Sequence, residues 1–270
     1  MNEFLTRLKW EWRMGIRQRM LLVFSATAIV GFLIAILFGG LSGSNTNGMF
    51  VAMIQIGVLL LPLIAIHLTA IDSNASLRQD ELLLALPVSR SKLFLGKALS
   101  QIAIYGASLL IAGTIPISYL LIAKQSGLLS FFIVAGLFWL LGGFFIALGN
   151  LIGILARNRI SVLIGATATW LCFSILGDTI AILLSNWLSG FSYRVILFGY
   201  LTLNPVAMIR TTGMLLLSGS ESYGAAGLLW LRVFSSIEMG IGVAIAITTI
   251  WCVVALGVGV WWFRRSEIGK

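Results

Sequence analysis

The stretch 72–97, DSNASLRQDELLLALPVSRSKLFLGK, is the longest polar interruption in the first two-thirds of an otherwise apolar chain. Long apolar runs flank it on both sides. A membrane protein that keeps one substantial charged segment on one side of the bilayer is expected to meet a soluble partner there. The segment contains seven charged residues: Asp72, Arg78, Asp80, Glu81, Arg90, Lys92 and Lys97.

The composition of the whole chain predicts an all-α, polytopic membrane protein. Hydrophobic residues make up 59% of the 270 positions and charged residues only 10%, and the mean hydropathy is +1.04. A soluble domain does not bury that much apolar surface. The two cysteines, Cys172 and Cys252, lie in the middle of apolar runs, so no disulfide framework is expected.

Residues 1–19 predict an amphipathic helix that lies in the lipid headgroup layer. Phe4, Leu8, Trp12 and Ile16 are four positions apart and share one helical stripe, and the basic residues lie largely off that stripe. A solvated basic tail is the alternative. The segment is not expected to be a cleavable signal, because the apolar run that follows is too long for one.

Residues 20–270 predict a single domain with six transmembrane helices. A helix needs about 20 apolar residues to cross the hydrocarbon core, and each predicted span is long enough. The second span contains Pro62 and the single histidine, His67. The predicted spans are 20–38, 49–71, 99–123, 128–156, 160–184 and 241–263.

The region 185–240 is predicted to be periplasmic or re-entrant and to form short outer helices between spans 5 and 6. Its apolar pieces are too short to cross and are interrupted by polar residues. Asn204 followed by Pro205 is typical of a helix start, a cap and then the first helical residue.

Basic residues predict the orientation of the chain. With six spans, 14 of the 18 Lys and Arg residues fall on the side of the termini and of the 72–97 segment. The positive-inside rule therefore predicts that both termini and this segment are cytoplasmic. The expected location is the inner membrane of a bacterial cell. The same rule accounts for the net charge of +9, so nucleic acid is not expected as a partner, whereas membrane lipid is.

Motifs for chemistry within the chain are missing from the sequence. Gly96-Lys97 lacks the remainder of a P-loop, and G-x-S-x-G and H-E-x-x-H do not occur, so we do not expect an enzyme, a bound cofactor or a metal site. His67 and Asp178 are candidates for a membrane path because polar groups inside spans are costly. For His67 the alternative is a helix-contact residue, and for Asp178 it is a partner of Arg194 or of a backbone amide.

Gly149 and Gly153 form a G-x-x-x-G pattern in the fourth predicted span. Small residues at this spacing let two helix backbones approach closely. The contact can lie within one chain or between two.

The segment from Glu81 to Lys97 resembles the region after the second span of ABC-2 type transporter permeases. The matching residues are Glu81, Pro87, Ser89, Arg90, Leu95, Gly96 and Lys97. The resemblance implies a permease homodimer, two cytoplasmic ATPase subunits that bind ATP and Mg²⁺, and in some members a periplasmic partner. It implies that the segment holds a coupling helix, with these residues as candidate ATPase contacts: Asp72, Leu77, Arg78, Asp80, Glu81, Arg157 and Arg159.

A narrower resemblance is to the NosY group, the permease subunits of the transporter for nitrous oxide reductase maturation. It rests on residues 61–65, on the 87–97 segment and on the outer-region residues Asn204, Pro205 and Arg210. Four methionines that are expected towards the outer side could hold Cu(I) through their thioethers or could simply pack: Met49, Met53, Met208 and Met214.

Three functions remain open from the sequence. The first is a permease that converts ATP-driven motion of a cytoplasmic partner into rearrangement across the bilayer. The second is a self-contained secondary transporter, which would use ionisable groups near the midplane. The third is a membrane anchor that transmits force without passing a solute.

Overall fold

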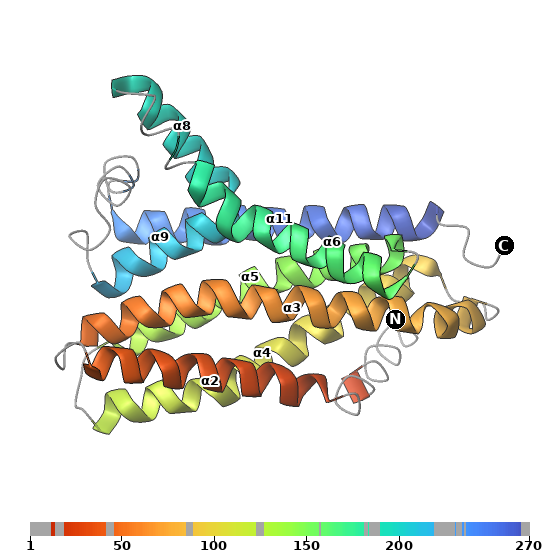
Figure 1. Ribbon diagram of the computed structural model, residues 1–270, viewed down its shortest axis with the longest axis horizontal. Coiled ribbons are helices and arrows are strands. Elements are labelled where there is room, and N and C mark those ends of the chain that lie inside the picture. The colour runs from red at the N-terminus through yellow and green to blue at the C-terminus, as the bar shows by residue number, and fades with distance from the viewer. Residues whose placement is uncertain are drawn as a thin grey trace.

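The computed structural model describes residues 12–13, 19–41, 46–84, 89–122, 127–156, 158–180, 183, 190–218, 230, 234 and 236–265. Within these ranges every regular element is a helix, which confirms the all-α prediction (Figure 1). The helices are α2 (Met20–Leu41), α3 (Thr46–Leu84), α4 (Arg90–Ile122), α5 (Leu128–Leu155), α6 (Arg159–Leu171), the π-helical η1 (Cys172–Leu176), α8 (Gly190–Leu203), α9 (Pro205–Ser218) and α11 (Ile237–Arg265).

Six of the described helical stretches are long and apolar enough to cross a membrane, as the sequence predicts. The count rises to seven if α8 and α9, which bend by 100° at Asn204, form one broken span. The six stretches are Met20–Gly39, Gly48–Leu77, Arg90–Ile122, Leu128–Leu155, Arg159–Ile180 and Ile237–Arg265.

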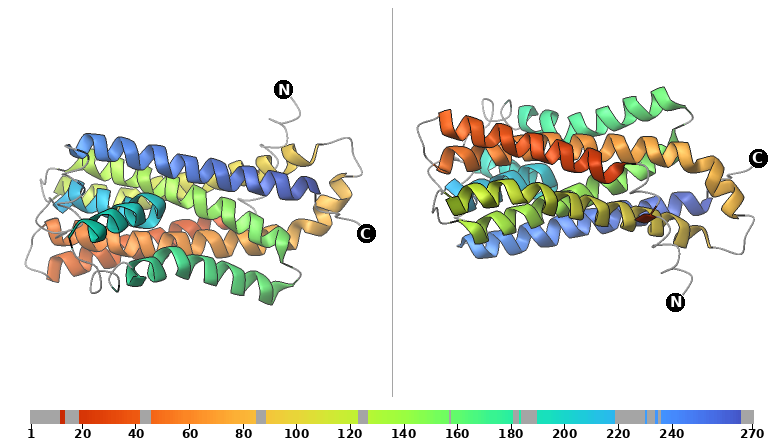
Figure 2. Two further views of the ribbon diagram at one scale, coloured as in Figure 1. Left: turned by 90° about the horizontal axis from the view of Figure 1, so that it is seen from above. Right: turned by 90° about the horizontal axis from the view of Figure 1, so that it is seen from below.

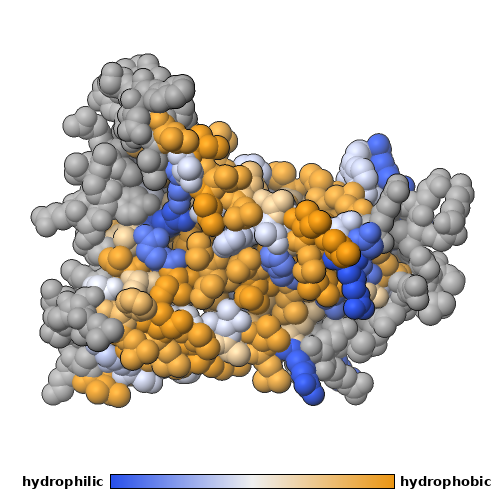
Figure 3. Space-filling model, in the orientation of Figure 1, coloured by the Kyte–Doolittle hydropathy of each residue, from blue (hydrophilic) through white to orange (hydrophobic). Residues whose placement is uncertain are grey.

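The long helices lie side by side, with α3 and α5 in the centre of the bundle (Figure 1). More than half of the apolar window of each central helix is buried, against 17% for the spans of α6 and α11. The peripheral helices α6 and α11 cover α3 and α5 from opposite sides (Figure 2). Apolar side chains dominate the face of the bundle in Figure 3, as expected for a surface in contact with lipid.

Glycines in α5 explain why it packs so closely on α3. A Cβ atom at Gly153 would lie 2.7 Å from Ser73 Cβ, and one at Gly149 would lie 2.7 Å from the Ile66 carbonyl oxygen. The G-x-x-x-G pattern therefore serves a contact within this chain, because any side chain there would push the two backbones apart.

The two ends of the bundle differ. The start of α2 and the end of α11 lie at the end where α3 passes into α4, which we call the α3–α4 end (Figure 1). The broken pair α8/α9 belongs to the opposite end. Val206 and Met208 of α9 are fully buried, and α9 packs on α3, α5 and α11, so protein covers the break at Asn204.

The two predicted span boundaries on either side of the polar segment differ from the ends of the helices observed. α3 does not end at Ile71, because no glycine or proline interrupts the chain before Pro87, and α4 begins at Arg90 rather than at Leu99. The predicted amphipathic helix over 1–19 lies outside the described residues, apart from Trp12, Arg13 and Arg19.

Candidate coupling site

The predicted coupling segment is continuous with the second spanning helix. α3 runs for 39 residues, from the opposite end of the bundle through the apolar window and on to Leu84. Figure 2 shows this helix extending beyond its neighbours at the α3–α4 end. A displacement of the last turns of α3 is therefore transmitted along one continuous helix into the centre of the bundle.

Asp72 forms a shielded ion pair with Lys97 of α4 at the point where α3 leaves the apolar window. The Lys97 Nζ to Asp72 Oδ2 distance is 2.9 Å, and the two side chains are only 10% and 13% exposed. Lys97 also donates to the Asp72 carbonyl oxygen and to Ser76 Oγ. These extra hydrogen bonds help to offset the desolvation cost that a buried pair carries.

Gln101 extends this pair to α5. Its Nε2 donates to Asp72 Oδ2 at 2.9 Å, and its Oε1 accepts from Asn150 Nδ2 at 2.7 Å. Asn150 and Gln101 are both almost fully buried. A chain of polar contacts therefore joins α3, α4 and α5 in the order Asp72, Gln101, Asn150.

Two neighbours of Asp72 bind the backbone of α5 directly. Ser73 Oγ donates to the Asn150 carbonyl oxygen at 3.4 Å, and Asn74 Nδ2 donates to the carbonyl oxygens of Gly153 and Ala156 at 3.0 Å each. Asn74 thereby satisfies carbonyls that the last turn of α5 leaves open. We name Asp72, Ser73, Asn74, Lys97, Gln101 and Asn150 the polar clamp.

The polar clamp was missed at the sequence level except for Asp72. That residue was predicted to contact an ATPase, and the structure gives it partners inside the bundle. Gln101 and Asn150 carried a usable signal, because polar side chains inside apolar runs are costly unless they have partners.

Two of the other predicted coupling residues lie in the described part of the chain. Leu77 is half-buried on α3, and Arg159 is exposed at the start of α6, where Asn158 Oδ1 accepts from the Ser161 amide at 2.8 Å. The remaining ones have side chains outside the described part of the chain: Arg78, Asp80, Glu81 and Arg157.

His67 joins α3 to α6. Its Nδ1 lies 2.8 Å from the Leu63 carbonyl oxygen and its Nε2 lies 2.9 Å from Thr167 Oγ1. A carbonyl oxygen only accepts, so Nδ1 donates to Leu63. These contacts correspond to the helix-contact interpretation of His67.

Asp178 lies against α9 and α8. The structure pairs it with Arg210 of α9, and Tyr200 also donates to its carboxylate, whereas the side chain of Arg194, which the sequence interpretation named, lies outside the described part of the chain. Arg210 follows the predicted helix start: Pro205 is the first residue of α9, and Asn204 Oδ1 accepts from the Val206 amide at 2.9 Å. The structure thus brings together Asp178, Asn204 and Arg210.

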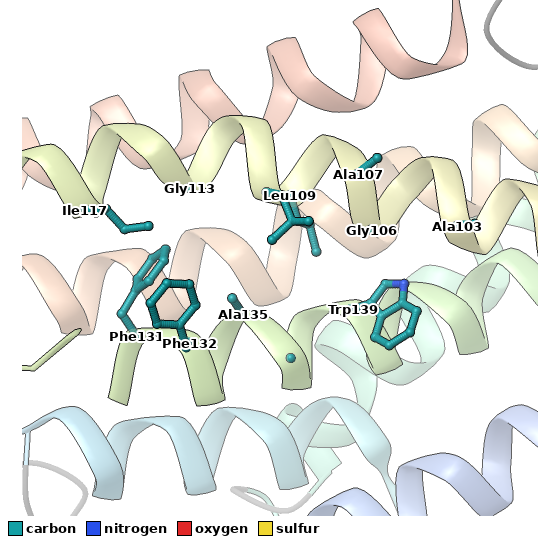
Figure 4. Close-up of a pocket in the computed structure, with 12 residues that line it drawn as sticks. Ala103, Gly106, Ala107, Leu109, Gly113, Ile117, Phe131, Phe132, Ala135 and Trp139 are labelled. Carbon is teal, nitrogen blue, oxygen red and sulfur yellow. The ribbon is translucent and has the colours of Figure 1, made fainter. Parts of the chain in front are cut away.

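The four methionines and a groove between α4 and α5 lie apart from the polar clamp. Met49, Met53, Met208 and Met214 are all buried in the main core. The groove, of about 490 Å³, lies between α4 and α5, and its lining is apolar (Figure 4). Its indole Nε1, on Trp139, already donates to the Ile102 carbonyl oxygen at 3.0 Å.

The fold and the clamp define a polytopic helical membrane protein whose protruding helix is hydrogen-bonded into the bundle core. The chain belongs to the family described as ABC-2 family transporter protein, whose sequence profile matches residues 5–268. It is thus a multi-pass membrane domain of the ABC transporter class. No curated protein sequence matches it significantly.

Proposed function

We propose that this chain is the permease subunit of an ABC transporter and that the last part of α3, from Asp72 to Leu84, receives a cytoplasmic ATPase subunit. The observation that carries the proposal is the unbroken α3, which the polar clamp ties to α4 and α5 where it leaves the apolar window. Movement of a docked partner then reaches three helices at once.

The energy source in this proposal lies in the partner. The sequence contains no P-loop, so ATP and Mg²⁺ would be bound by the ATPase subunit. Arg159 is exposed at the start of α6, two residues after Arg157, which lies outside the described part of the chain. These two arginines offer a second cytoplasmic contact, and they and the charged residues of α3 suit a polar rim around an apolar anchor such as Leu77.

Charge reversal of Glu81 tests the proposed docking surface. In the Glu81→Lys variant the ATPase subunit should no longer co-purify, or the permease should no longer stimulate its ATP hydrolysis. Glu238→Lys is the matched control, because it makes the same change at an exposed position at the opposite end of the bundle. Co-purification and stimulation that match the wild type in Glu81→Lys would contradict the proposal, and the Asp80→Lys/Glu81→Lys double variant makes the same test more severe.

Further proposals, on subunit composition and on the process served, rest on the resemblance of the sequence to ABC-2 permeases and to the NosY group. We propose a permease homodimer with two ATPase subunits and, following the NosY resemblance, a periplasmic partner and a role in nitrous oxide reductase maturation. Copper handling would use the thioethers of Met49, Met53, Met208 and Met214. Isothermal titration of Cu(I) into the purified chain and into a variant with these methionines replaced by leucine tests this; equal binding by both would contradict it.

One alternative is supported by a specific observation. A rigid α3 that is clamped to its neighbours suits the transmission of force to an outer partner without any solute crossing. Reconstituted, ATP-dependent flux of a defined solute would count against this alternative. A self-contained secondary transporter would instead need gradient-driven flux by this chain alone, with His67 and Asp178 free to exchange ions or protons.

A further inference from the structure

The fifth spanning stretch contains a π-helical turn, η1, between α6 and the residues that follow it. The Gly177 amide donates to the Cys172 carbonyl oxygen five residues earlier, instead of four as in an α-helix. Such a turn accommodates one extra residue and is common at functional sites. It also changes which backbone carbonyls are available to other groups.

Side chains of the broken pair α8/α9 bind this turn. Asn204 Nδ2 donates to the Phe173 carbonyl oxygen at 2.8 Å, and Arg210 Nη2 donates to that of Ser174 at 3.4 Å. One turn further on, Asp178 accepts from Arg210 and from the Tyr200 hydroxyl. We name Asp178, Tyr200, Asn204 and Arg210 the outer lock.

The other half of the same span is held by α3 instead. Thr167 is hydrogen-bonded to His67, and Trp170 Nε1 donates to the Leu59 carbonyl oxygen at 3.0 Å. The π turn therefore lies between a part fixed to the bundle centre and a part fixed to α8/α9. Any relative movement of these two parts must therefore change the geometry of the π turn.

The contact at the outer lock leaves two polar atoms unsatisfied. Ser174 Oγ and Arg210 Nε are buried and have no hydrogen-bond partner, although the two residues lie against each other. A buried polar atom without a partner costs free energy, so this arrangement is not the best that these side chains could make. The deficit raises the free energy of this arrangement and so narrows its gap to an arrangement that gives both atoms a partner.

We infer that Asp178 and Arg210 are positioning residues for the transport step and that displacement of the π turn along its helix opens the outer lock. Each residue that the turn passes rotates by about 100° around the helix axis, since an α-helix has 3.6 residues per turn. A displacement past Asp178 turns its carboxylate away from Arg210 and frees α9. The inference rests on the proposed function only in taking the ATPase cycle as its driving force.

A spin label at position 176 reports on this rotation. Leu176 is about half exposed and lies in the segment that would turn, so a nitroxide is attached to Leu176→Cys after both native cysteines are replaced by serine. The complex is reconstituted in lipid nanodiscs and its spectrum is recorded without nucleotide and after vanadate trapping. Ile164→Cys, exposed on the part of α6 that α3 holds, is the matched label control.

The spectrum at position 176 should change on trapping, and the spectrum at position 164 should not. Deletion of Ser174 removes the extra residue and leaves a regular α-helix in which Asp178 still faces Arg210. This variant should assemble, give the same spectrum in both states, and lose most of the nucleotide-dependent activity. A deletion variant that keeps the spectral change and full coupling would overturn the inference, as would an unchanged label in the vanadate-trapped wild-type complex.

A second variant needs no ATPase. In the purified chain, Arg210→Gln breaks the lock and should shift the nucleotide-free spectrum at position 176 towards that of the trapped state. Arg159→Gln, which removes an exposed cation at the other end of α6, should leave it unchanged. A folded Arg210→Gln chain with the wild-type spectrum would refute the lock, whereas failure of a partner to bind the wild-type chain would refute the proposed function alone.

Discussion

Replacement of Lys97 by methionine tests the polar clamp most directly. Methionine keeps the apolar stem of lysine but removes its charge, so the Asp72 carboxylate stays shielded with Gln101 as its remaining side-chain donor. Removal of one partner from a buried ion pair costs about 3–5 kcal/mol. We expect the Lys97→Met variant to lose an amount of this order in free energy of unfolding.

A double-mutant cycle separates the pair from its surroundings. Asp72→Asn should cost less than Lys97→Met, because the lysine keeps the Asp72 carbonyl oxygen and Ser76 Oγ as acceptors. The Asp72→Asn/Lys97→Met double variant removes both charges of this pair and should be more stable than the sum of the two single losses implies. The expected interaction energy is about 2–3 kcal/mol, at the upper end of the range for residues in contact.

The assay is reversible unfolding of the purified chain in mixed micelles by titration with a denaturing detergent. Arg159→Met serves as the control, since it removes an exposed cation and should change the free energy by less than about 0.5 kcal/mol. Additivity of the two clamp substitutions to within about 0.5 kcal/mol would refute the idea that they act as a pair.

Two further predictions use the same titration. Gly153→Ala should lose about 1–3 kcal/mol in free energy of unfolding, because the new Cβ atom has no room against α3. The control Gly136→Ala has nothing within 4 Å of the new atom and should be neutral or slightly stabilising. Equal effects at both positions would disprove the close contact. Thr167→Val should lose about 0.6 kcal/mol through its bond to His67, a typical value for hydrogen bonds between membrane helices. The control Thr169→Val, whose hydroxyl bonds its own helix, should lose less, and the reverse order would argue against the His67 contact.

The helices of the bundle could be predicted from the sequence because each depends on a local property. Apolar runs long enough to span gave six crossings, and the residue pair Asn204-Pro205 gave the start of α9. The spacing of Gly149 and Gly153 also anticipated a close helix contact, although only the structure shows that the partner is α3.

The polar contacts could not be predicted, because they depend on how distant segments pack. Asp72 and Asn150 are far apart in the chain and are linked through Gln101 only after α3, α4 and α5 have assembled. Arg194 lies nearer to Asp178 in sequence than Arg210 does, but the bend at Asn204 brings α9 back against the bundle. Nothing in the run of residues 172–176 distinguishes a π turn from a regular α-helix.

The polar clamp divides α3 into a short arm and a long arm, and their lengths set how a movement of one end is transmitted to the other. At 1.5 Å per residue, α3 measures about 58 Å, of which about 18 Å lies beyond Asp72 and about 39 Å lies on the other side. If the clamp acts as a pivot, a displacement of the tip of the short arm is roughly doubled at the far tip of the long arm, near which Ile54 packs against Gly213 of α9. Pro62 lies within the long arm, where a helix bends most readily, so part of that larger displacement is taken up as curvature before it reaches α9.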